Sequence, residues 1–397
     1  MLDAGTSLEP AIALHVCTRY QRGGSERRVQ DSIRALPDLR HHLLVGADSD
    51  VDLARHQTGA EQVEVLPSLV RQIAPARDVA ALLALWRLLR RRQYSVVVSH
   101  QSKAGVLGRL AAAAGGPPAV HSLSMASFGP GYGAVENWLF TRLERVLGRR
   151  TAGFCVVGHD LAQRFAAIGV PAERLHVVRS GIPLPTALST RNEARRLIDE
   201  RYGTVPGRRL LCYVGSLEPR KNTLQLPALL KALHERTAEL PQLLVVGDGP
   251  QSGALLTELA ARNLADHAVL TGYLSDPALV HDALRAADVT VLLSDVEGLP
   301  QVLVQSAAAG TPFVSYDVEG VRELLALGAA GSAIEPGRLD AVVDAVAHWL
   351  AIAEHRSPEP VADLSSWTTE SITAAYRSVI GQAVRAPMTA GASARRG

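Results

Sequence analysis

Short apolar runs alternate with longer stretches of helical period from one end of the 397-residue chain to the other. In the first half, the runs that we expect to be strands are residues 12–17, 42–46, 63–66, 95–99, 119–122, 154–157 and 175–178. Parallel neighbours cannot be joined by a tight turn, so strands spaced this far apart are typical of a parallel sheet covered by crossover helices. The pattern predicts an α/β fold, with helices over residues 25–36 and 78–92 among others.

The alternation stops at residues 183–191 (PLPTALSTR), where proline and small polar residues indicate a linker. It then restarts with the apolar runs LLCYVGS, LLVVGDG, AVLTG, VTVLLS and PFVSYD. We therefore expect two doubly wound domains facing a central cleft, over residues 1–183 and 184–364. A helix at 365–385 is expected to pack back across the domains, and the tail at 386–397 to be disordered.

Composition and charge exclude several classes of protein. Lys and Arg number 41 and Asp and Glu 39, so the near-balanced charge of +2 argues against wholesale nucleic-acid binding. No apolar run is long enough to span a bilayer, and the N-terminus lacks the pattern of a secretion signal. Three widely spaced cysteines indicate neither a disulfide framework nor a zinc site, so we expect a reducing, cytoplasmic compartment.

The most informative segment is residues 289–316, VTVLLSDVEGLPQVLVQSAAAGTPFVSY. It predicts a strand, a polar loop with Glu297, and a helix whose first position is Pro300 and which a glycine ends. Open parallel sheets bind ligands beyond the carboxyl ends of their strands, so Glu297 and the amides of the turn are expected at that edge. Gln305, about two turns into the helix, can point along the same face. The alternative is a capped helix whose dipole Glu297 merely complements.

EGLPQVLVQSAAAGTPFV resembles the E-x7-E segment of the retaining GT-B glycosyltransferases of family 4, also called group 1. Further segments match the family in the expected order: RGGSE (22–26), VVSHQSKAG (97–105), VHSLS (120–124), VGSLEPRKN (214–222), LLVVGDGP (243–250) and LTGYLSD (270–276). The likeness extends from about residue 12 to residue 380. It implies a GT-B fold with an N-terminal acceptor-binding domain and a C-terminal domain that binds a nucleotide sugar.

The resemblance also implies roles for single residues, of which four are the candidate catalytic residues. Arg220 and Lys221 would bind the donor diphosphate, Glu297 would contact hydroxyls of the donor sugar, and His121 would lie near the transferred sugar. Two cations at a strand end can neutralise a departing diphosphate, and such charge stabilisation is often the largest contribution to catalysis. His100 ends the other matching strand. The other implied donor-binding residues are Gly23, Gly24, Gly215, Gly247, Gly249, Tyr273, Leu274, Gly298, Leu299, Pro300 and Gln305.

Each of these residues also has a simpler interpretation when taken alone. Arg220 and Lys221 fit a solvated basic turn, and a histidine at a strand end is commonly structural. Gln305 stands where the family usually has a second glutamate that binds the ribose hydroxyls. Glutamine keeps an acceptor oxygen but loses the charge. The departure also fits a catalytically silent subunit that binds nucleotide for a partner transferase.

The implied activity is retaining transfer of a sugar from a nucleoside-diphosphate donor, UDP-sugar on family frequency, to a glycan, lipid or small molecule. It needs no metal and no cofactor. A UDP-sugar epimerase of the same architecture is the second alternative. Asp48-Ser49-Asp50 mimics the metal-binding D-x-D of GT-A transferases, but tandem α/β halves fit GT-B, and an acidic solvated loop is the other interpretation. The sequence lacks the motifs of phosphate-loop kinases, α/β-hydrolases and zinc proteases.

Two basic segments, residues 87–92 (RLLRRR) and 142–150 (RLERVLGRR), are candidates for contact with an anionic membrane or an acidic acceptor. They also fit solvated helix ends, where cations offset the helix dipole. The loops at 68–77 and 124–133 are expected to shape the acceptor site, because loops commonly carry specificity.

Overall fold

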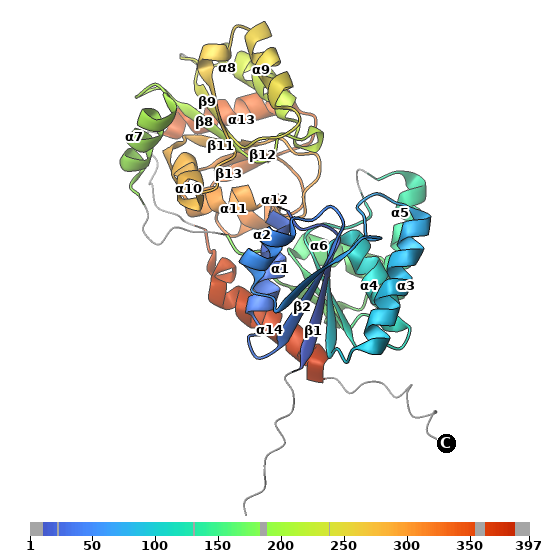
Figure 1. Ribbon diagram of the computed structural model, residues 1–397. Helices are drawn as coiled ribbons and strands as arrows, with labels where there is room; N and C mark the ends of the chain where they lie inside the picture. Colours follow the sequence, from blue (N-terminus) through green and yellow to red (C-terminus); the bar gives the residue numbers. More distant parts are fainter. Residues whose placement is uncertain are drawn as a thin grey trace, which may run out of the picture. The chain divides into compact units, whose positions relative to one another are not determined.

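The computed structural model describes residues 11–21, 24–129, 132–182, 189–237, 239–353 and 362–385. The chain forms two compact units, the N-terminal unit (Met1–Gly181 with Ser366–Gly397) and the C-terminal unit (Ile182–Ser365). In Figure 1 the first runs from blue to green and includes the red C-terminal helix, and the second runs from light green to orange. The expected boundary at 183/184 and the expected disordered tail at 386–397 lie outside the described residues.

The N-terminal unit contains a seven-stranded parallel sheet in the order β3-β2-β1-β4-β5-β6-β7. Its strands are β1 (Ile12–Cys17), β2 (Arg40–Gly46), β3 (Gln62–Leu66), β4 (Val96–His100), β5 (Ala119–Leu123), β6 (Gly153–Val156) and β7 (Leu175–Val177). The helices are α1 (Gly24–Arg34), α2 (Val51–Thr58), α3 (Pro75–Arg91), α4 (Ser102–Ala113), α5 (Ala134–Gly148) and α6 (His159–Ala167). Every strand expected in the first half is present, with ends shifted by at most two residues.

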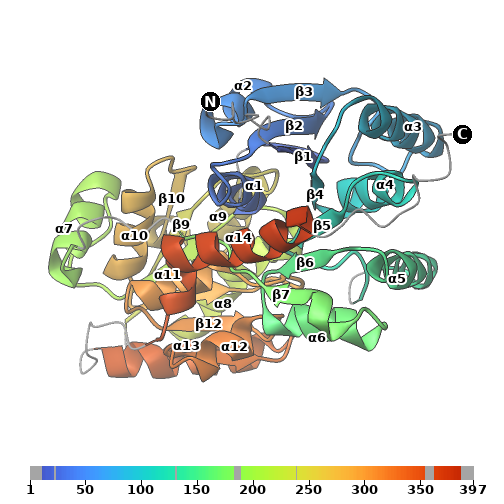
Figure 2. The ribbon, with the colours of Figure 1, turned by 90° about the horizontal axis from the view of Figure 1, so that it is seen from below.

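Helices cover both faces of this sheet (Figure 2). The core against α3 and α4 includes Leu14, Val16 and Val97, and the core on the opposite face includes Ala13 and Val96. Because neighbouring residues of one strand are buried on opposite faces, the central strands β1 and β4 are mostly apolar, whereas the exposed edge strand β3 alternates. This double burial is why continuous apolar runs located the strands so well.

The last helix, α14 (Thr369–Arg385), returns from the C-terminal unit to pack on the N-terminal unit. Figure 2 shows it in red beside α1. Tyr376 is fully buried, and its hydroxyl shares a 2.9 Å hydrogen bond with Oγ of Ser122. Nε of Arg377 donates to the carbonyl of Ala35 at 3.0 Å. The chain end is therefore part of the N-terminal core.

The C-terminal unit contains a six-stranded parallel sheet in the order β10-β9-β8-β11-β12-β13. Its strands are β8 (Leu210–Val214), β9 (Gln242–Val246), β10 (Ala268–Gly272), β11 (Val289–Leu292), β12 (Phe313–Tyr316) and β13 (Gly331–Ile334). The helices are α7 (Arg191–Tyr202), α8 (Leu226–His234), α9 (Ser252–Ala261), α10 (Pro277–Ala286), α11 (Gln301–Ala308), α12 (Val321–Ala326) and α13 (Leu339–Ile352). β13 was not expected from the sequence, because it is a half-buried edge strand of mostly small residues (GSAI).

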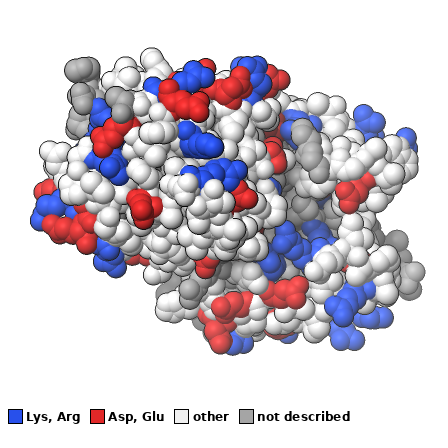
Figure 3. Space-filling view, turned by 90° about the horizontal axis from the view of Figure 1, so that it is seen from above, with Lys and Arg blue, Asp and Glu red and all other residues white. Residues whose placement is uncertain are grey.

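Acidic and basic side chains are interspersed over much of the face shown in Figure 3, in keeping with their near-equal numbers. Of the helices in the described part of the chain, none has both the length and the apolar character needed to cross a bilayer.

Candidate active site

The site of the C-terminal unit lies where its strand order reverses. β8 and β11 are neighbours, but the chain continues from β8 to β9 on one side and from β11 to β12 on the other. The loops after β8 and β11 therefore diverge, which opens the crevice where doubly wound sheets bind ligands. The first loop carries Arg220 and Lys221, and the second carries Glu297.

Hydrogen bonds hold these two loops together. The first loop ends in a 3-10 turn, Pro219–Lys221, and Asn222 follows it in the left-handed conformation with φ 52°. Nδ2 of Asn222 donates to the carbonyl of Leu293 at 3.0 Å and to Oδ1 of Asp295 at 2.5 Å. The Asp295 amide donates to the Arg220 carbonyl at 3.0 Å. Asn222 thus fixes the position of the basic pair, a role that sequence reasoning missed although asparagine is favoured at positive φ.

The three predicted charged residues meet at this point. Nζ of Lys221 bonds to Oε1 of Glu297, and Nη1 of Arg220 lies 3.6 Å from the same oxygen. The side chains of Lys221 and Glu297 are only 12% and 10% exposed, whereas Arg220 is 44% exposed and also bonds Glu218 at 3.1 Å. Folding has already removed most of the water from this ion pair, at a desolvation cost. A diphosphate that replaced the carboxylate as the partner of Lys221 would therefore bind in a preformed cationic site.

Glycines let the neighbouring loops pack backbone against backbone. Gly247 has φ 139°, and a Cβ there would collide with the Gly215 carbonyl. A Cβ on Gly249 would lie 2.7 Å from backbone atoms of Leu217. The amides of Gly215 and Gly247 donate to Val246 and Gly272 at 3.0 Å and 2.9 Å. The predicted glycines at 247 and 249 are therefore required by the close approach of the loops, in addition to any contact with a ligand, whereas a Cβ on Gly215 would meet only the Tyr213 side chain.

The segment after Glu297 differs from the expectation in one detail. Pro300 is the N-cap of α11, with φ −70° and ψ 106°, and the helix begins at Gln301. Gln305 therefore lies one turn into the helix, where it is half-buried. Gly298, Leu299 and Pro300 are buried. Leu299 packs against Gly320, where a Cβ would lie 2.9 Å from the Leu299 Cα. The Gly320 backbone therefore supports the turn before α11.

Two tyrosines and a leucine complete this edge of the sheet. Tyr273 follows β10 and is 57% exposed, while Leu274 packs against the core. Tyr213 is buried on β8, and its hydroxyl donates to the Ser216 carbonyl at 2.9 Å. Burial, and then the nearby Glu297 carboxylate, raise the pKa of Tyr213 well above its usual value. Tyr213 therefore stays a neutral donor that holds the loop after β8.

His121 is buried on β5 of the N-terminal unit. Its Nδ1 lies 3.1 Å from both Oγ and the carbonyl oxygen of Ser99. The ring packs so closely under Gly105 that a Cβ there would overlap it. Burial, and then the Arg109 cation, lower the pKa of His121 well below its usual value, so the ring is neutral. Its role beside the transferred sugar stays a prediction.

His100 belongs to a buried group that the sequence did not reveal, which we call the histidine cluster (His15, His41 and His100). Nε2 of His100 lies 3.3 Å from Nδ1 of His15, and Nε2 of His15 lies 3.0 Å from Nδ1 of His41. His41 in turn donates from Nε2 to the Leu36 carbonyl at 2.8 Å. Burial lowers the pKa of all three rings, that of His100 to about 3, so the cluster is neutral at physiological pH.

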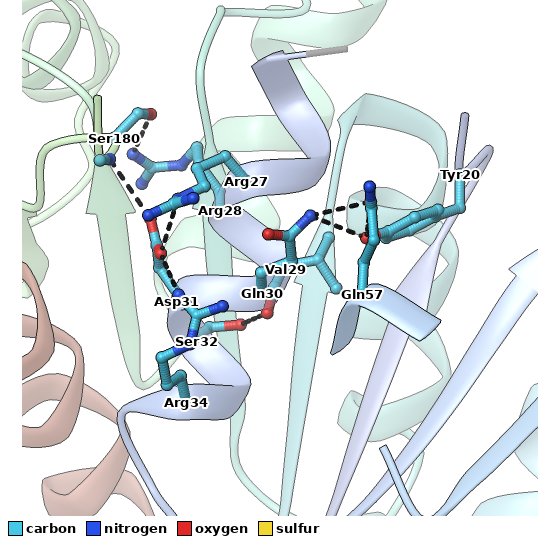
Figure 4. A network of polar contacts seen from close by, with 11 residues as sticks. Tyr20, Arg27, Arg28, Val29, Gln30, Asp31, Ser32, Arg34, Gln57 and Ser180 are labelled. Atoms are coloured by element: carbon cyan, nitrogen blue, oxygen red, sulfur yellow. Dashed lines mark hydrogen bonds and ion pairs between the residues drawn. The ribbon is translucent and has the colours of Figure 1, made fainter. Parts of the chain in front are cut away.

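A buried arginine ties α1 to the carboxyl ends of the sheet (Figure 4). Arg28 is 2% exposed, and its guanidinium donates to the carbonyls of Cys155 and Val178 and to the hydroxyls of Ser122 and Ser180, over 2.7–3.2 Å. These bonds hold α1 to the C-terminal ends of β5, β6 and β7. Gly24 is the first residue of α1, and Gly23 lies outside the described residues.

The D-x-D sequence has a structural role at its second aspartate. Oδ1 of Asp50 caps α2 by accepting a hydrogen bond from the Leu53 amide at 2.9 Å. Across the described ranges, no group of three or more His, Cys, Asp and Glu side chains is arranged to hold a metal ion.

Comparison with known proteins matches both units to glycosyltransferases. Residues 194–358 match the family model described as glycosyl transferases group 1, and residues 23–181 match a glycosyl transferase 4-like domain. UDP-Gal:alpha-D-GlcNAc-diphosphoundecaprenol alpha-1,3-galactosyltransferase of Escherichia coli is 27% identical over 337 residues, which cover 84% of this chain and 86% of that protein.

Solved structures show the fold. HepE of Anabaena, in complex with UDP-glucose, superimposes with a TM-score of 0.68 at 18% identity and covers 94% of this chain and 99% of that chain. Sucrose-phosphate synthase from Thermosynechococcus elongatus gives a TM-score of 0.70 at 16% identity, with 94% and 97% covered. These likenesses show the GT-B fold of two Rossmann-like units, and the two family models show that the chain belongs to the group 1 glycosyltransferases.

Proposed function

We propose that this glycosyltransferase is a retaining enzyme that moves a sugar from a UDP-sugar to a glycan, lipid-linked or small-molecule acceptor. The observation that carries the proposal is the meeting of Arg220, Lys221 and Glu297 at the strand-order reversal of the C-terminal unit. Two cations and one carboxylate suit a diphosphate and the hydroxyls of its sugar.

The choice of donor and acceptor draws on relatives. The name of the E. coli relative states UDP-Gal as donor and a diphosphoundecaprenol-linked sugar as acceptor, and HepE was solved with UDP-glucose. We infer a UDP-sugar for this chain in the same way, with the uridine nucleotide on the C-terminal unit and the acceptor on the N-terminal unit. His121 and the loops at 68–77 and 124–133 are the proposed acceptor-side elements.

In the proposed mechanism, the ion pair between Lys221 and Glu297 exchanges partners. Lys221 and Arg220 turn to the diphosphate, and Glu297 accepts hydrogen bonds from the donor sugar. The bond from the anomeric carbon to the diphosphate oxygen breaks, and the acceptor oxygen bonds to the same carbon on the same face. The acceptor attacks this face directly, so no carboxylate nucleophile is needed. The departing phosphate oxygen takes the acceptor proton, so no separate carboxylate base is needed.

We also propose that the reaction proceeds without a metal and in the cytoplasm. Arg220 and Lys221 supply the positive charge that a divalent ion would otherwise bring to the diphosphate. Cys17, Cys155 and Cys212 are free and buried, which fits a reducing compartment. Transfer that continues in excess EDTA would support the first point, and transfer that stops until Mg²⁺ or Mn²⁺ is restored would contradict it.

The decisive experiment incubates the protein with UDP-sugars, with and without candidate acceptors, after a titration with UDP. Acceptor-dependent transfer with the donor's anomeric configuration kept in the product, read by NMR, supports the proposal. Inversion contradicts retention. Conversion of the UDP-sugar without acceptor would indicate the epimerase alternative. UDP binding without turnover would indicate the silent subunit, for which the substitution of glutamate by Gln305 is the motivating observation.

A further inference from the structure

Exposed apolar side chains gather on one helical layer of the N-terminal unit. Of the large apolar side chains that are exposed among the described residues, seven of eleven lie on α3, on α5 or just before α3: Ile73, Val79, Leu83, Val135, Trp138, Leu139 and Val146. Both helices pack against α4, so they lie on the same side of the sheet (Figure 2). We call the exposed residues of 71–92 and 133–150 the α3/α5 surface.

The two helices present similar outward stripes. Residues three or four apart share a helix face, and the exposed stripe of α3 contains Val79, Leu83, Arg87 and Arg91. That of α5 contains Val135, Leu139, Arg142, Val146 and Arg149. Both helices are crossovers that run from the carboxyl edge of the sheet to its amino edge. Most of the exposed apolar side chains therefore lie in the N-terminal halves of the two helices, and most of the exposed arginines lie in or just after the C-terminal halves. Of the helical residues, Arg77 and Val146 are the exceptions.

The charge of this surface is strongly positive. The two segments expose ten arginines: Arg71, Arg77, Arg87, Arg90, Arg91, Arg92, Arg142, Arg145, Arg149 and Arg150. They expose a single carboxylate, Glu136. The other two acidic residues are engaged, because Asp78 bonds Lys103 at 2.7 Å and Glu144 is buried in an ion pair with Arg109. A chain with a net charge of only +2 thus concentrates positive charge here.

Aromatic rings and guanidinium groups adjoin one another on both helices. The Arg142 guanidinium lies 4.9 Å from the centre of the Trp138 ring, which is 59% exposed, and that of Arg90 lies 5.3 Å from the Trp86 ring. A tryptophan beside an arginine suits the boundary between lipid tails and headgroups. There the indole ring can contact the lipid tails while the guanidinium binds a lipid phosphate.

We propose that the α3/α5 surface docks the protein on an anionic phospholipid bilayer. Apolar side chains from the N-terminal halves of the two helices enter the acyl boundary, and the arginines bind lipid phosphates. Charge complementarity selects this occupant over a second copy of the chain, because a two-fold pairing would bring the same ten arginines against one another. The proposal goes beyond the sugar-transfer reaction and does not depend on it.

The test is flotation of the full chain with vesicles of equal parts phosphatidylglycerol and phosphatidylcholine, and with vesicles of phosphatidylcholine alone. We expect binding to the anionic vesicles at low salt and release near 1 M salt, where the Debye length falls to about 3 Å. Tryptophan emission should shift to the blue on binding, and the Trp138→Phe variant should bind but show a smaller shift.

Two variants divide the surface into its parts. Arg142→Gln with Arg149→Gln should weaken binding to anionic vesicles about 25-fold, since each arginine near the surface is expected to contribute about fivefold. Val135→Glu with Trp138→Glu should abolish it. Leu256→Glu, the same kind of change at a 54% exposed position of α9 in the C-terminal unit, is the matched control and should bind as the unaltered chain does.

Three results would overturn the proposal. The first is absence of binding to anionic vesicles, and the second is equal binding by the surface variants and the control. The third is self-association that the surface variants abolish without any vesicle binding, which would assign the surface to a second copy. Unfolding midpoints equal to that of the unaltered chain show that the variants are folded, which the exposure of all four altered positions predicts.

Discussion

Removing the ammonium group of Lys221 should reduce the rate of sugar transfer by about 10²-fold. Lys221 is 12% exposed and bonds Glu297, so its ammonium is already positioned and largely desolvated. Loss of one preorganised donor to a developing negative charge typically costs about 2.7–4 kcal/mol, or 10²–10³ in kcat. Arg220 lies 3.6 Å from the same carboxylate oxygen and can cover part of the loss, which places the expectation at the lower end.

The effect on folding should be small by comparison. In the Lys221→Ala variant Glu297 keeps Arg220 as a cationic neighbour, so we expect the free energy of unfolding to fall by only about 1–2 kcal/mol. UDP affinity should fall about tenfold, which corresponds to about 1.4 kcal/mol. The Lys221→Arg variant keeps the charge with a different shape and should recover part of the rate.

The assay is steady-state turnover of a UDP-sugar, with calorimetric titration of UDP and urea unfolding on the same samples. Lys231 is exposed on α8, so Lys231→Ala removes a lysine from the same unit without touching the site. A folded Lys221→Ala variant that transfers sugar at the rate of the Lys231→Ala control would refute the diphosphate role.

Four further predictions concern the site and the core. Glu297→Gln should lower turnover more than 10-fold but leave UDP affinity equal or higher, because Lys221 loses its competing carboxylate; loss of both in parallel would argue against a sugar contact. Gly247→Ala should lower the thermal midpoint, at a cost of about 1–3 kcal/mol for strain at φ 139°, and an unchanged midpoint would contradict the packing argument. Arg109→Leu leaves the buried Glu144 carboxylate unpaired and should lower the free energy of unfolding, measured in urea, by about 3–5 kcal/mol. The double variant Arg109→Leu with Glu144→Leu should recover most of that loss. Because burial lowers the pKa values of the histidine cluster, the unfolded chain binds more protons than the folded chain below about pH 6.5. The contribution of the cluster to the free energy of unfolding should therefore be complete above that pH and decrease as the pH falls, by up to about 1.4 kcal/mol per pH unit for each ring. A flat profile would show that the rings are already protonated in the folded state.

The fold was readable from the sequence wherever burial on both faces makes a strand continuously apolar. The first expected strand coincides with β1, Ile12–Cys17, and the others of that sheet are close to their observed ends. β13 could not be predicted, because an edge strand that contains Gly331, Ser332 and Ala333 has no continuous run of large apolar residues. Pro300 was placed one position too far into its helix, since a proline fits both the N-cap and the first helical turn.

The site was only partly readable. Arg220, Lys221 and Glu297 stood out as charged residues after strands, but Asn222 became visible only from its hydrogen bonds to the neighbouring loop. The buried role of Arg28 had no sequence signal either, because an arginine on a polar helix is normally expected in solvent.

By itself, the sequence determined which segments are strands and helices and which residue types follow each strand, because hydrophobic period and turn chemistry depend on neighbours along the chain. The tertiary structure decided that Lys221 meets Glu297 from 76 residues away, and that the histidine cluster is buried and neutral. Those facts depend on the order of the strands in each sheet. Strand order is set by the packing of distant segments, which no local pattern encodes.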